Sequence, residues 1–444
     1  MALIHTQPDL IREHLLRCAS HQFTEGDVQH WWHPPHGRGV RTMIFDDYLW
    51  LPYVAGDYVN RTGDRGVLDE TVHFLDSRPL NPGEESFYDL PVRSHEKATL
   101  YEHCTRTILH ALRFGQHGLP LMGSGDWNDG MNLVGVKGEG ESVWLAMFLH
   151  SVLEQFGDLA RMRGDSAFAD VCTREAQRLR EKIESEAWDG QWYLRAFYDD
   201  DTALGSSRNQ ECAIDATVQS WAVLSGAGSP ERREQAMRSL ERILIDPHHG
   251  LIRLLAPPFD KSSQEPGYIK GYPPGVRENG GQYTHAAVWV VMAFARMGES
   301  RRVERLLSMI NPINHGSTRE KAGRYLVEPY VMAADIHGSE PHAGRGGWTW
   351  YTGSASWMYR LIVESVLGLQ LKVNTLTFSP CIPAKWEHFK IHYRFRETVY
   401  HCAGMQVKPG GKIRVVVDGM EREDRAVALD DDHREHFVQI VIGG

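Results

Sequence analysis

Apolar residues recur at helical spacing in ten segments of the first 370 residues, and this pattern constrains the fold more than any other feature. The segments are residues 9–20, 48–61, 95–114, 143–163, 166–187, 215–225, 231–245, 285–297, 301–310 and 353–369. Ser94 before one segment, and Gly226 and Gly298 after two others, favour helix ends. We therefore predict a mainly α fold, an (α/α)6 toroid-type barrel of antiparallel helix pairs. A complete barrel needs two helices beyond these ten, so two are expected to be short or misread.

The pattern changes near residue 370. Four segments either alternate apolar and polar residues or are rich in β-branched residues, and proline, glycine or aspartate bounds them. These segments are residues 376–380, 389–402, 412–419 and 436–444. We predict a catalytic helical domain over residues 1–370 and a small antiparallel β domain, of β-sandwich or jelly-roll type, over residues 371–444.

Composition narrows the function classes. The net charge is −10, and the basic residues do not cluster into a stripe. Both features argue against nucleic acid and anionic membranes as partners. No apolar run reaches the roughly 18 to 20 residues of a membrane span. The first residues lack a signal-peptide pattern, and the six cysteines form no C-x-x-C pair. We expect a cytoplasmic protein without a metal site.

Long loops rich in glycine, proline and tryptophan separate the helices and carry most of the chemically useful side chains. Residues 31–50 hold Arg38, Arg41, Asp46 and Asp47 beside three tryptophans. Arginine forks suit phosphate or paired sugar hydroxyls, and tryptophan faces suit sugar rings. A purely structural ion-pair network and a tryptophan-filled core are the competing interpretations, and composition alone does not separate them.

A second loop, residues 118–132, places Asp126, Trp127 and Asp129 after a Gly-Ser-Gly turn. An Asx turn, a helix cap or a calcium loop would explain part of this pattern. The calcium interpretation is weak because the alternating ligands and the closing glutamate are missing. We interpret the loop as part of an active site.

Two further segments add polar groups. Residues 268–289 contain Tyr272 and Glu278, which are candidate substrate ligands, and His285 at the start of a helix. Residues 344–359 contain Thr352 and Gly353, which open the last helix, where free N–H groups favour an anion. A structural histidine and an ordinary threonine cap are the competing interpretations.

Together these segments resemble glycoside hydrolase family 94, the cellobiose and chitobiose phosphorylase family. HWWHPPHGRGVRTMIFDDYLWLPY and RFRETVYH are most similar to the C-terminal region of cyclic β-1,2-glucan synthases, and the likeness runs from about residue 8 to the end. The resemblance implies that Asp129 is the general acid and that Trp127 lines the glucosyl pocket. It also implies that Arg41 and Asp47 bind the sugar. The implied phosphate ligands are His285, Thr352 and Gly353, with Arg38 as the nearest candidate for a further one.

The implied reaction is inverting phosphorolysis of β-1,2-gluco-oligosaccharides, or second of cellobiose-like sugars, to α-glucose 1-phosphate. Inorganic phosphate is the co-substrate and no cofactor is implied. One acid suffices, because phosphate is already an anionic nucleophile. Two alternatives stay open: an inverting hydrolase with Asp126 or Glu278 as base, and a non-catalytic glucan-binding module. The family's N-terminal β-sandwich has no counterpart here, so we expect a homodimer or a part of a longer synthase.

Overall fold

The computed structural model describes residues 1–407 and 412–443, and within them the ten predicted helices are present. They are α1 (Pro8–Ala19), α2 (Asp47–Thr62), α3 (Leu100–Ala111), α4 (Val143–Arg163), α5 (Ser166–Glu186), α6 (Ala216–Leu224), α7 (Pro230–Leu244), α8 (Thr284–Arg296), α9 (Ser300–Ile310) and α12 (Thr352–Arg360). Two short helices, α10 (Pro312–His315) and α11 (Arg319–Tyr325), lie before α12, and a π-helix, η5 (Leu361–Val366), continues it. No helix of the described residues has the length and apolarity that a membrane span requires.

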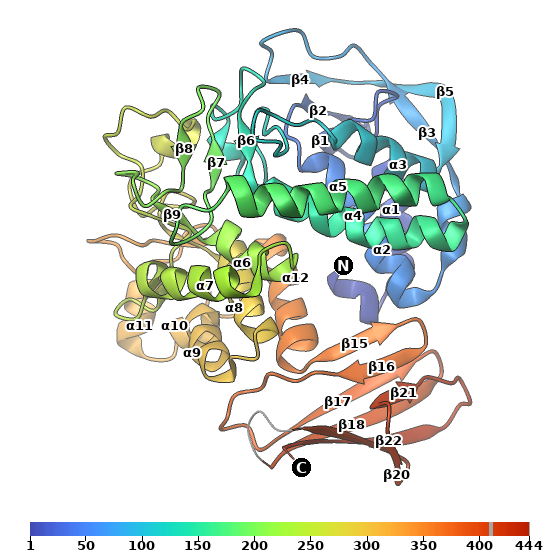
Figure 1. Cartoon of the computed structure of the whole chain (residues 1–444). Coiled ribbons are helices and arrows are strands. Elements are labelled where there is room, and N and C mark those ends of the chain that lie inside the picture. Colours follow the sequence, from blue (N-terminus) through green and yellow to red (C-terminus); the bar gives the residue numbers. More distant parts are fainter. Residues whose placement is uncertain (408–411, 444) are drawn as a thin grey trace.

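The helices pack as an inner row and an outer row (Figure 1). The inner helices α2, α4, α6, α8 and α12 contact one another in that order, while α3, α5, α7 and α9 pack on the inner helices α2, α4, α6 and α8. The first turns of α4 and α6 are buried on every side, as is expected of central helices. Trp144, Trp221 and Trp289 meet between them, with ring centroids of Trp221 and Trp289 5.3 Å apart. Part of the tryptophan content therefore fills the core.

The predicted start of α3 is wrong by five residues. Residues Val92–Thr99 form β5, which pairs with β3 (Thr71–Asp76), and the helix begins only at Leu100. Thr99 caps it: its hydroxyl accepts from the Glu102 N–H, and the Glu102 carboxylate accepts from the Thr99 N–H. Ser94 instead accepts from the Glu96 N–H within the strand. A second unpredicted sheet consists of β1 (Gln29–His33), β2 (Arg38–Thr42) and β4 (Ser86–Asp89).

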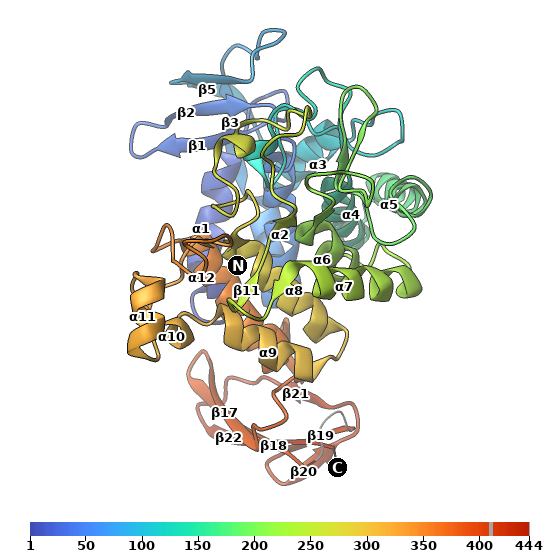
Figure 2. The same cartoon turned by 90° about the vertical axis from the view of Figure 1, so that its left-hand side faces the viewer.

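The strands after α12 form two sheets, seen below the helices in Figures 1 and 2. One contains β15 (Leu369–Lys372), β16 (Thr375–Phe378) and β21 (Ala426–Ala428). The other has the order β17-β18-β22-β19-β20, formed by His388–Phe395, Thr398–Gln406, Glu435–Ile442, Ile413–Val417 and Met420–Arg422.

The prediction of a wholly antiparallel β region is wrong at one pairing. Strand β22 runs parallel to β18, because the chain passes through β21 in the other sheet before it returns. Residues 408–411 and 444, which belong to the predicted β region, lie outside the described residues. The division at residue 370 falls beside the start of β15 and stays a prediction as a domain boundary.

The capping assignment predicts a stability difference between two neighbouring substitutions. Thr99→Ala removes the cap of α3 and is expected to lower the free energy of unfolding by about 1 kcal/mol. Ser94→Ala, the matched control, leaves the cap intact and is expected to change it by less than about half of that amount. Urea unfolding followed by circular dichroism measures both, and an equal loss in both variants would contradict the assignment.

Candidate active site

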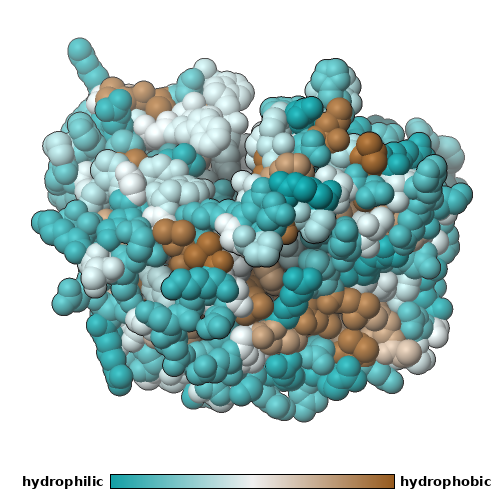
Figure 3. Space-filling view, turned by 90° about the horizontal axis from the view of Figure 1, so that it is seen from above, coloured by the Kyte–Doolittle hydropathy of each residue, from teal (hydrophilic) through white to brown (hydrophobic). Residues whose placement is uncertain are grey.

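A cavity of about 470 Å³ lies where the N-terminal ends of α2, α8 and α12 come together. Seven of the ten predicted site residues line it: Asp47, Trp127, Asp129, Glu278, His285, Thr352 and Gly353. The cavity is also lined by His30 and by Tyr283 and Tyr351, which immediately precede α8 and α12, and none of these three was predicted from the sequence. Figure 3 views the molecule from above, over the loops and strands at the top of Figure 1, and shows that this face is hollowed.

The loop of residues 118–132 is held against the segment that precedes α2. The Ser124 N–H donates to the Met43 carbonyl at 3.0 Å, and the Phe45 N–H donates to the Gly125 carbonyl at 3.3 Å. Gly125 has a φ of +137°, and a Cβ there would lie 3.1 Å from the Cα of Asp129. The tight turn therefore needs glycine, and it places the acidic residues of both segments around one cavity.

Asp126 is fully engaged in a buried network. Arg195 donates to both of its oxygens, at 2.6 and 2.7 Å, and the Ser142 hydroxyl donates at 2.6 Å. The Asn128 N–H donates to Oδ1 at 3.0 Å. Arg195 also lies 3.4 Å from Asp215, and all three charged side chains are about 1 % exposed or less. Asp126 is a structural carboxylate with no lone pair left over to activate water.

Asp129 has a different environment. It is half-buried at the first position of the short helix η3 (Asp129–Met131) and forms no ion pair within the described part of the chain. Burial, and then the charge of Asp129, raise the pKa of the neighbouring Tyr268 hydroxyl. Asp129 is therefore a carboxyl group at a cavity wall, with a phenol beside it and no arginine or lysine to neutralise it.

The cavity also contains two carboxyl groups whose pKa is raised. Burial, and then the charges of Asp47 and Asp126, raise the pKa of Asp46 well above its ordinary value. Burial also raises the pKa of Glu278, although Arg277 partly opposes this. The positive ends of three helices face these groups and offset part of the remaining negative charge.

His30 supplies a positive charge in the cavity. Its Nδ1 lies 2.8 Å from Asp47 Oδ2. Burial disfavours the charged ring, but the hydrogen bond and the charge of Asp47 outweigh this effect and raise the pKa of His30 to about 9. At neutral pH His30 is an imidazolium that holds Asp47 in place.

His285 is a neutral hydrogen-bond donor, because burial lowers its pKa to about 3. The Trp127 indole N–H donates to His285 Nδ1 at 3.3 Å, which leaves the proton on Nε2. That Nε2 is buried and has no partner among the described residues. Gly353 lies alongside, since a Cβ there would be 3.9 Å from His285 Nδ1.

The start of α12 presents free backbone donors beside His285. Its N-cap residue, Tyr351, makes no side-chain capping hydrogen bond, and the buried Ser354 hydroxyl has no partner within the described residues. First-turn N–H groups have no acceptor inside a helix, so they can bind an anion at this end. The pairing of a neutral imidazole donor with a helix N-terminus is a surface for a phosphate-sized group.

The structure does not place Arg41 among the residues that line this cavity, so its predicted role as a sugar ligand stays a prediction. Arg41 is 3 % exposed and lines a separate cavity. It donates to Asp27 at 2.6 and 2.7 Å and to Glu25 at 3.0 Å. The remaining guanidinium N–H groups reach the carbonyl groups of Ser77 and Arg78. All of its donors are used, so none is free for a sugar.

Arg38 and Tyr272 also lie outside the residues that line the cavity. The exposed Arg38 guanidinium lies over the ring of Tyr88, 5.6 Å from its centroid. Tyr272 lies under Arg277, 5.0 Å away, and its carbonyl accepts from Asn279 at 2.7 Å. Arg38 belongs to the sheet of β1, β2 and β4, and Tyr272 supports the loop that carries Glu278.

The family model of the glycosyl hydrolase 94 superfamily, catalytic domain, matches residues 1–368. The chain belongs to this family. Its relatives include the solabiose phosphorylase of Paenibacillus borealis, which is 29% identical over 98% of this chain and 54% of that protein. The cyclic beta-(1,2)-glucan synthase NdvB of Rhizobium meliloti is 46% identical over 94% of this chain but only 15% of that protein. The 1,2-beta-oligoglucan phosphorylase of Listeria innocua is 23% identical over 86% of this chain and 36% of its own length.

The chain thus spans between about one seventh and one half of the lengths of these three relatives. Among solved structures, a GH78 family rhamnosidase of Bacillus sp. GL1 matches with a TM-score of 0.52 and 14% identity, over 91% of this chain and 35% of that one. That likeness concerns the fold alone. The described residues contain no group of three or more His, Cys, Asp or Glu side chains that could hold a metal ion.

The buried network around Asp126 predicts that replacing its arginine lowers the free energy of unfolding more than replacing an arginine of an exposed ion pair. Arg195→Met leaves two buried carboxylates without their cation and is expected to lower the free energy of unfolding by about 3 to 5 kcal/mol. Arg414, which holds Glu421 through a similar but exposed fork at 2.7 and 2.8 Å, is the matched control. Arg414→Met is expected to cost less than about 1 kcal/mol. Urea unfolding of both variants is the measurement, and similar losses would contradict the argument.

The His30–Asp47 pair predicts a pH dependence of stability. Because the folded-state pKa of about 9 exceeds the unfolded value, the pair stabilises fully below about pH 6.5 and loses that contribution as pH rises through 9. The free energy of unfolding should fall over this range by up to about 3 kcal/mol. His30→Gln should flatten this part of the profile. Unfolding curves at pH 6, 7.5 and 9 test it, and parallel profiles for both proteins would refute the pairing.

Proposed function

We propose that this chain catalyses inverting phosphorolysis of β-linked glucosides, and the reverse synthesis, with Asp129 as the general acid. One observation carries the proposal: Arg195 holds Asp126 of the D-W-N-D turn, whereas Asp129 of the same turn forms no ion pair among the described residues. The same cavity carries His285 and the free start of α12. A lone acid opposite an anion-binding surface suits a reaction in which phosphate is the nucleophile.

In the proposed reaction a phosphate oxygen forms a bond to the anomeric carbon as the glycosidic C–O bond breaks. The electron pair of that bond goes to the leaving oxygen, which takes the proton of Asp129. The products are α-glucose 1-phosphate and the shortened sugar. His285 Nε2–H and the N–H groups of Thr352 and Gly353 would hold the phosphate, while Trp127 and Asp47 would line the glucosyl site.

An inverting hydrolase is the second candidate, and Glu278 is the observation that favours it. Glu278 lines the same cavity, and its Oε2 is buried without a hydrogen-bond partner among the described residues. It could activate water as a base. Asp126 is unsuited to that role, because Arg195, Ser142 and the Asn128 N–H occupy its oxygens. A non-catalytic glucan-binding module is the remaining alternative.

The proposed substrates are β-1,2-gluco-oligosaccharides, with cellobiose-like β-1,4 sugars second. The similarity to a cyclic beta-(1,2)-glucan synthase and to a 1,2-beta-oligoglucan phosphorylase supports this order. We propose that the chain is part of a longer synthase, since the relatives are longer than this chain, with a homodimer as the alternative assembly. We also propose the (α/α)6 toroid for the helices, which their inner and outer rows support, and a sandwich or jelly roll for strands β15–β22.

Replacing the acid tests the proposal directly. Asp129→Asn cannot donate the proton, so release of glucose 1-phosphate from sophoro-oligosaccharides and phosphate should fall by about 10² to 10⁴-fold. Binding of the oligosaccharide, followed by calorimetry, should persist. Proton NMR of the fresh wild-type product should show the α anomer.

Glu278→Gln is the matched variant for the competing reaction. Release of free glucose without phosphate, lost in Glu278→Gln, would establish the hydrolase instead. Oligosaccharide binding without any turnover, at every phosphate concentration, would leave the binding module. Near-normal turnover by Asp129→Asn would remove Asp129 from the mechanism.

A further inference from the structure

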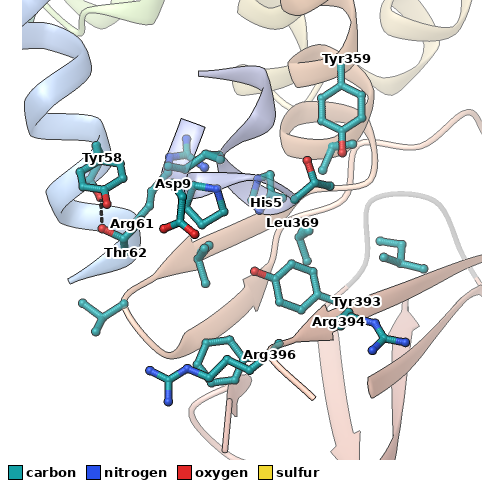
Figure 4. A pocket seen from close by; sticks show the side chains of 18 of the residues that line it. His5, Asp9, Tyr58, Arg61, Thr62, Tyr359, Leu369, Tyr393, Arg394 and Arg396 are labelled. Carbon is teal, nitrogen blue, oxygen red and sulfur yellow. Dashed lines mark hydrogen bonds between the residues drawn. The ribbon is translucent and has the colours of Figure 1, made fainter. Parts of the chain in front are cut away.

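A second and larger cavity, of about 910 Å³, lies between the helices and the C-terminal strands (Figure 4). Its walls come from the N-terminal turn η1 (Ala2–His5), the end of α2, the last turn of α12, and strands β15 and β17. None of the residues that line it also lines the candidate active site. The active-site chemistry described above therefore does not explain this cavity.

Two tyrosines direct unused hydroxyl groups into this cavity. Figure 4 shows Tyr359 on α12 and Tyr393 on β17 with their hydroxyl groups turned toward the space between the helix and the strand. Neither hydroxyl has a hydrogen-bond partner among the described side chains and backbone groups, and both phenol rings are wall surface. Burial, and then the nearby charge of Arg61, act on Tyr393, and burial prevails to raise its pKa to about 12, so it remains a donor.

His5 adds a buried polar group to the same wall. Its side chain is 4 % exposed, and neither ring nitrogen has a hydrogen-bond partner in the described part of the chain. Nε2 lies 3.5 Å from Glu364, whereas Nδ1 has no such neighbour. The ring meets Tyr393 edge to face, with centroids 6.2 Å apart. A buried imidazole nitrogen without a partner costs stability unless a ligand or water satisfies it.

The arginines of this cavity differ in their ion pairing: Arg61 inside it is ion-paired, whereas two arginines at the rim are not. Arg61 is committed to Asp57 at 2.7 Å and to Glu364 at 3.1 Å. Arg394 and Arg396 are exposed at the rim and have no carboxylate partner among the described residues, although Figure 4 shows the Arg394 side chain turned away from the ring of Tyr393. Arg396 lies over the ring of Phe395, 5.4 Å from its centroid. Free guanidinium forks beside an aromatic face can bind paired hydroxyl groups.

These observations define the ligand chemistry. The wall combines ring faces, unused phenol hydroxyls, an unpartnered imidazole nitrogen and free guanidinium groups, so the fitting ligand has apolar faces and many hydroxyl edges. We propose that this cavity is a second, non-catalytic binding site for an oligosaccharide. That the oligosaccharide is a β-glucan rests on the proposed function, whereas the site itself rests on the wall residues alone.

Helix α12 links the two cavities. Thr352 lines the candidate active site and Tyr359 lines the second cavity. Seven residues are two helical turns, so the two side chains lie on one face of the helix and about 10 Å apart along its axis. A long chain held at Tyr359 is thus close to the catalytic cavity, while a disaccharide in that cavity does not reach Tyr359. The second site should therefore matter for long substrates only.

The test removes the two hydroxyl groups and keeps the rings. Titration calorimetry of Asp129→Asn with long sophoro-oligosaccharides should show two binding events, and adding Tyr359→Phe and Tyr393→Phe should abolish one. In the otherwise native enzyme, the same tyrosine pair should raise the KM for long chains about tenfold, the loss expected from two hydrogen bonds. The kcat/KM for sophorose should stay within about twofold. The phenylalanine rings keep the packing, and an unchanged melting temperature confirms the fold.

Three outcomes would overturn the site. One is a single binding event in Asp129→Asn, and another is an unchanged long-chain KM in the tyrosine pair. The third is an event that inorganic phosphate alone produces and that Arg394→Ala with Arg396→Ala removes, which would make the cavity an anion site. The calorimetry needs no turnover. Two binding events in Asp129→Asn, together with no phosphorolysis by the native protein, would reject the proposed function and keep the second site.

Discussion

The buried pairing of Arg195 with Asp126 and Asp215 determines the geometry of the catalytic end of the molecule. Asp126 comes from the D-W-N-D loop, Arg195 directly precedes strand β7 (Ala196–Phe197), and Asp215 directly precedes α6. Ser142, which caps α4, joins the same network. One guanidinium therefore aligns the starts of two central helices with the catalytic loop. Trp127 and Asp129 lie close after Asp126 in the sequence. Their positions therefore depend on the buried charge of Arg195, which does not itself line the cavity.

The two walls of the candidate active site have opposite characters. Acidic side chains and the imidazolium of His30 line the side of α2, while neutral donors line the side of α8 and α12. Burial keeps His285 uncharged, so the anion wall works through N–H dipoles and not through a net positive charge. Such a wall can hold phosphate through hydrogen bonds alone, because the neutral imidazole and the backbone N–H groups are donors without a net charge.

The sequence alone predicted the helices and seven residues that the structure brings together around one cavity, and the differences from the prediction have physical reasons. Helices of three or more turns carry a clear period of 3.6, whereas residues 95–99 fit a helix and a strand equally well until the pairing with β3 decides. Seven of ten site residues came from loops that meet at helix starts. Arg41 lies outside the cavity because its side chain is ion-paired with Asp27 and Glu25, and sequence spacing does not show which way a strand side chain turns. His30 was missed because its charge comes from Asp47, seventeen residues away.

The strand order of the five-stranded sheet has a consequence for folding. Strand β22 follows the other four strands in sequence but is central in space, between β18 and β19. The β17–β18 and β19–β20 hairpins can each form from neighbouring residues, but they share no hydrogen bonds with one another. Each hairpin therefore has an open edge until residues 435–442 insert between them. Until that insertion both edges are templates for pairing with a strand of another molecule, so this sheet is protected from aggregation only when its last-joining strand is in place.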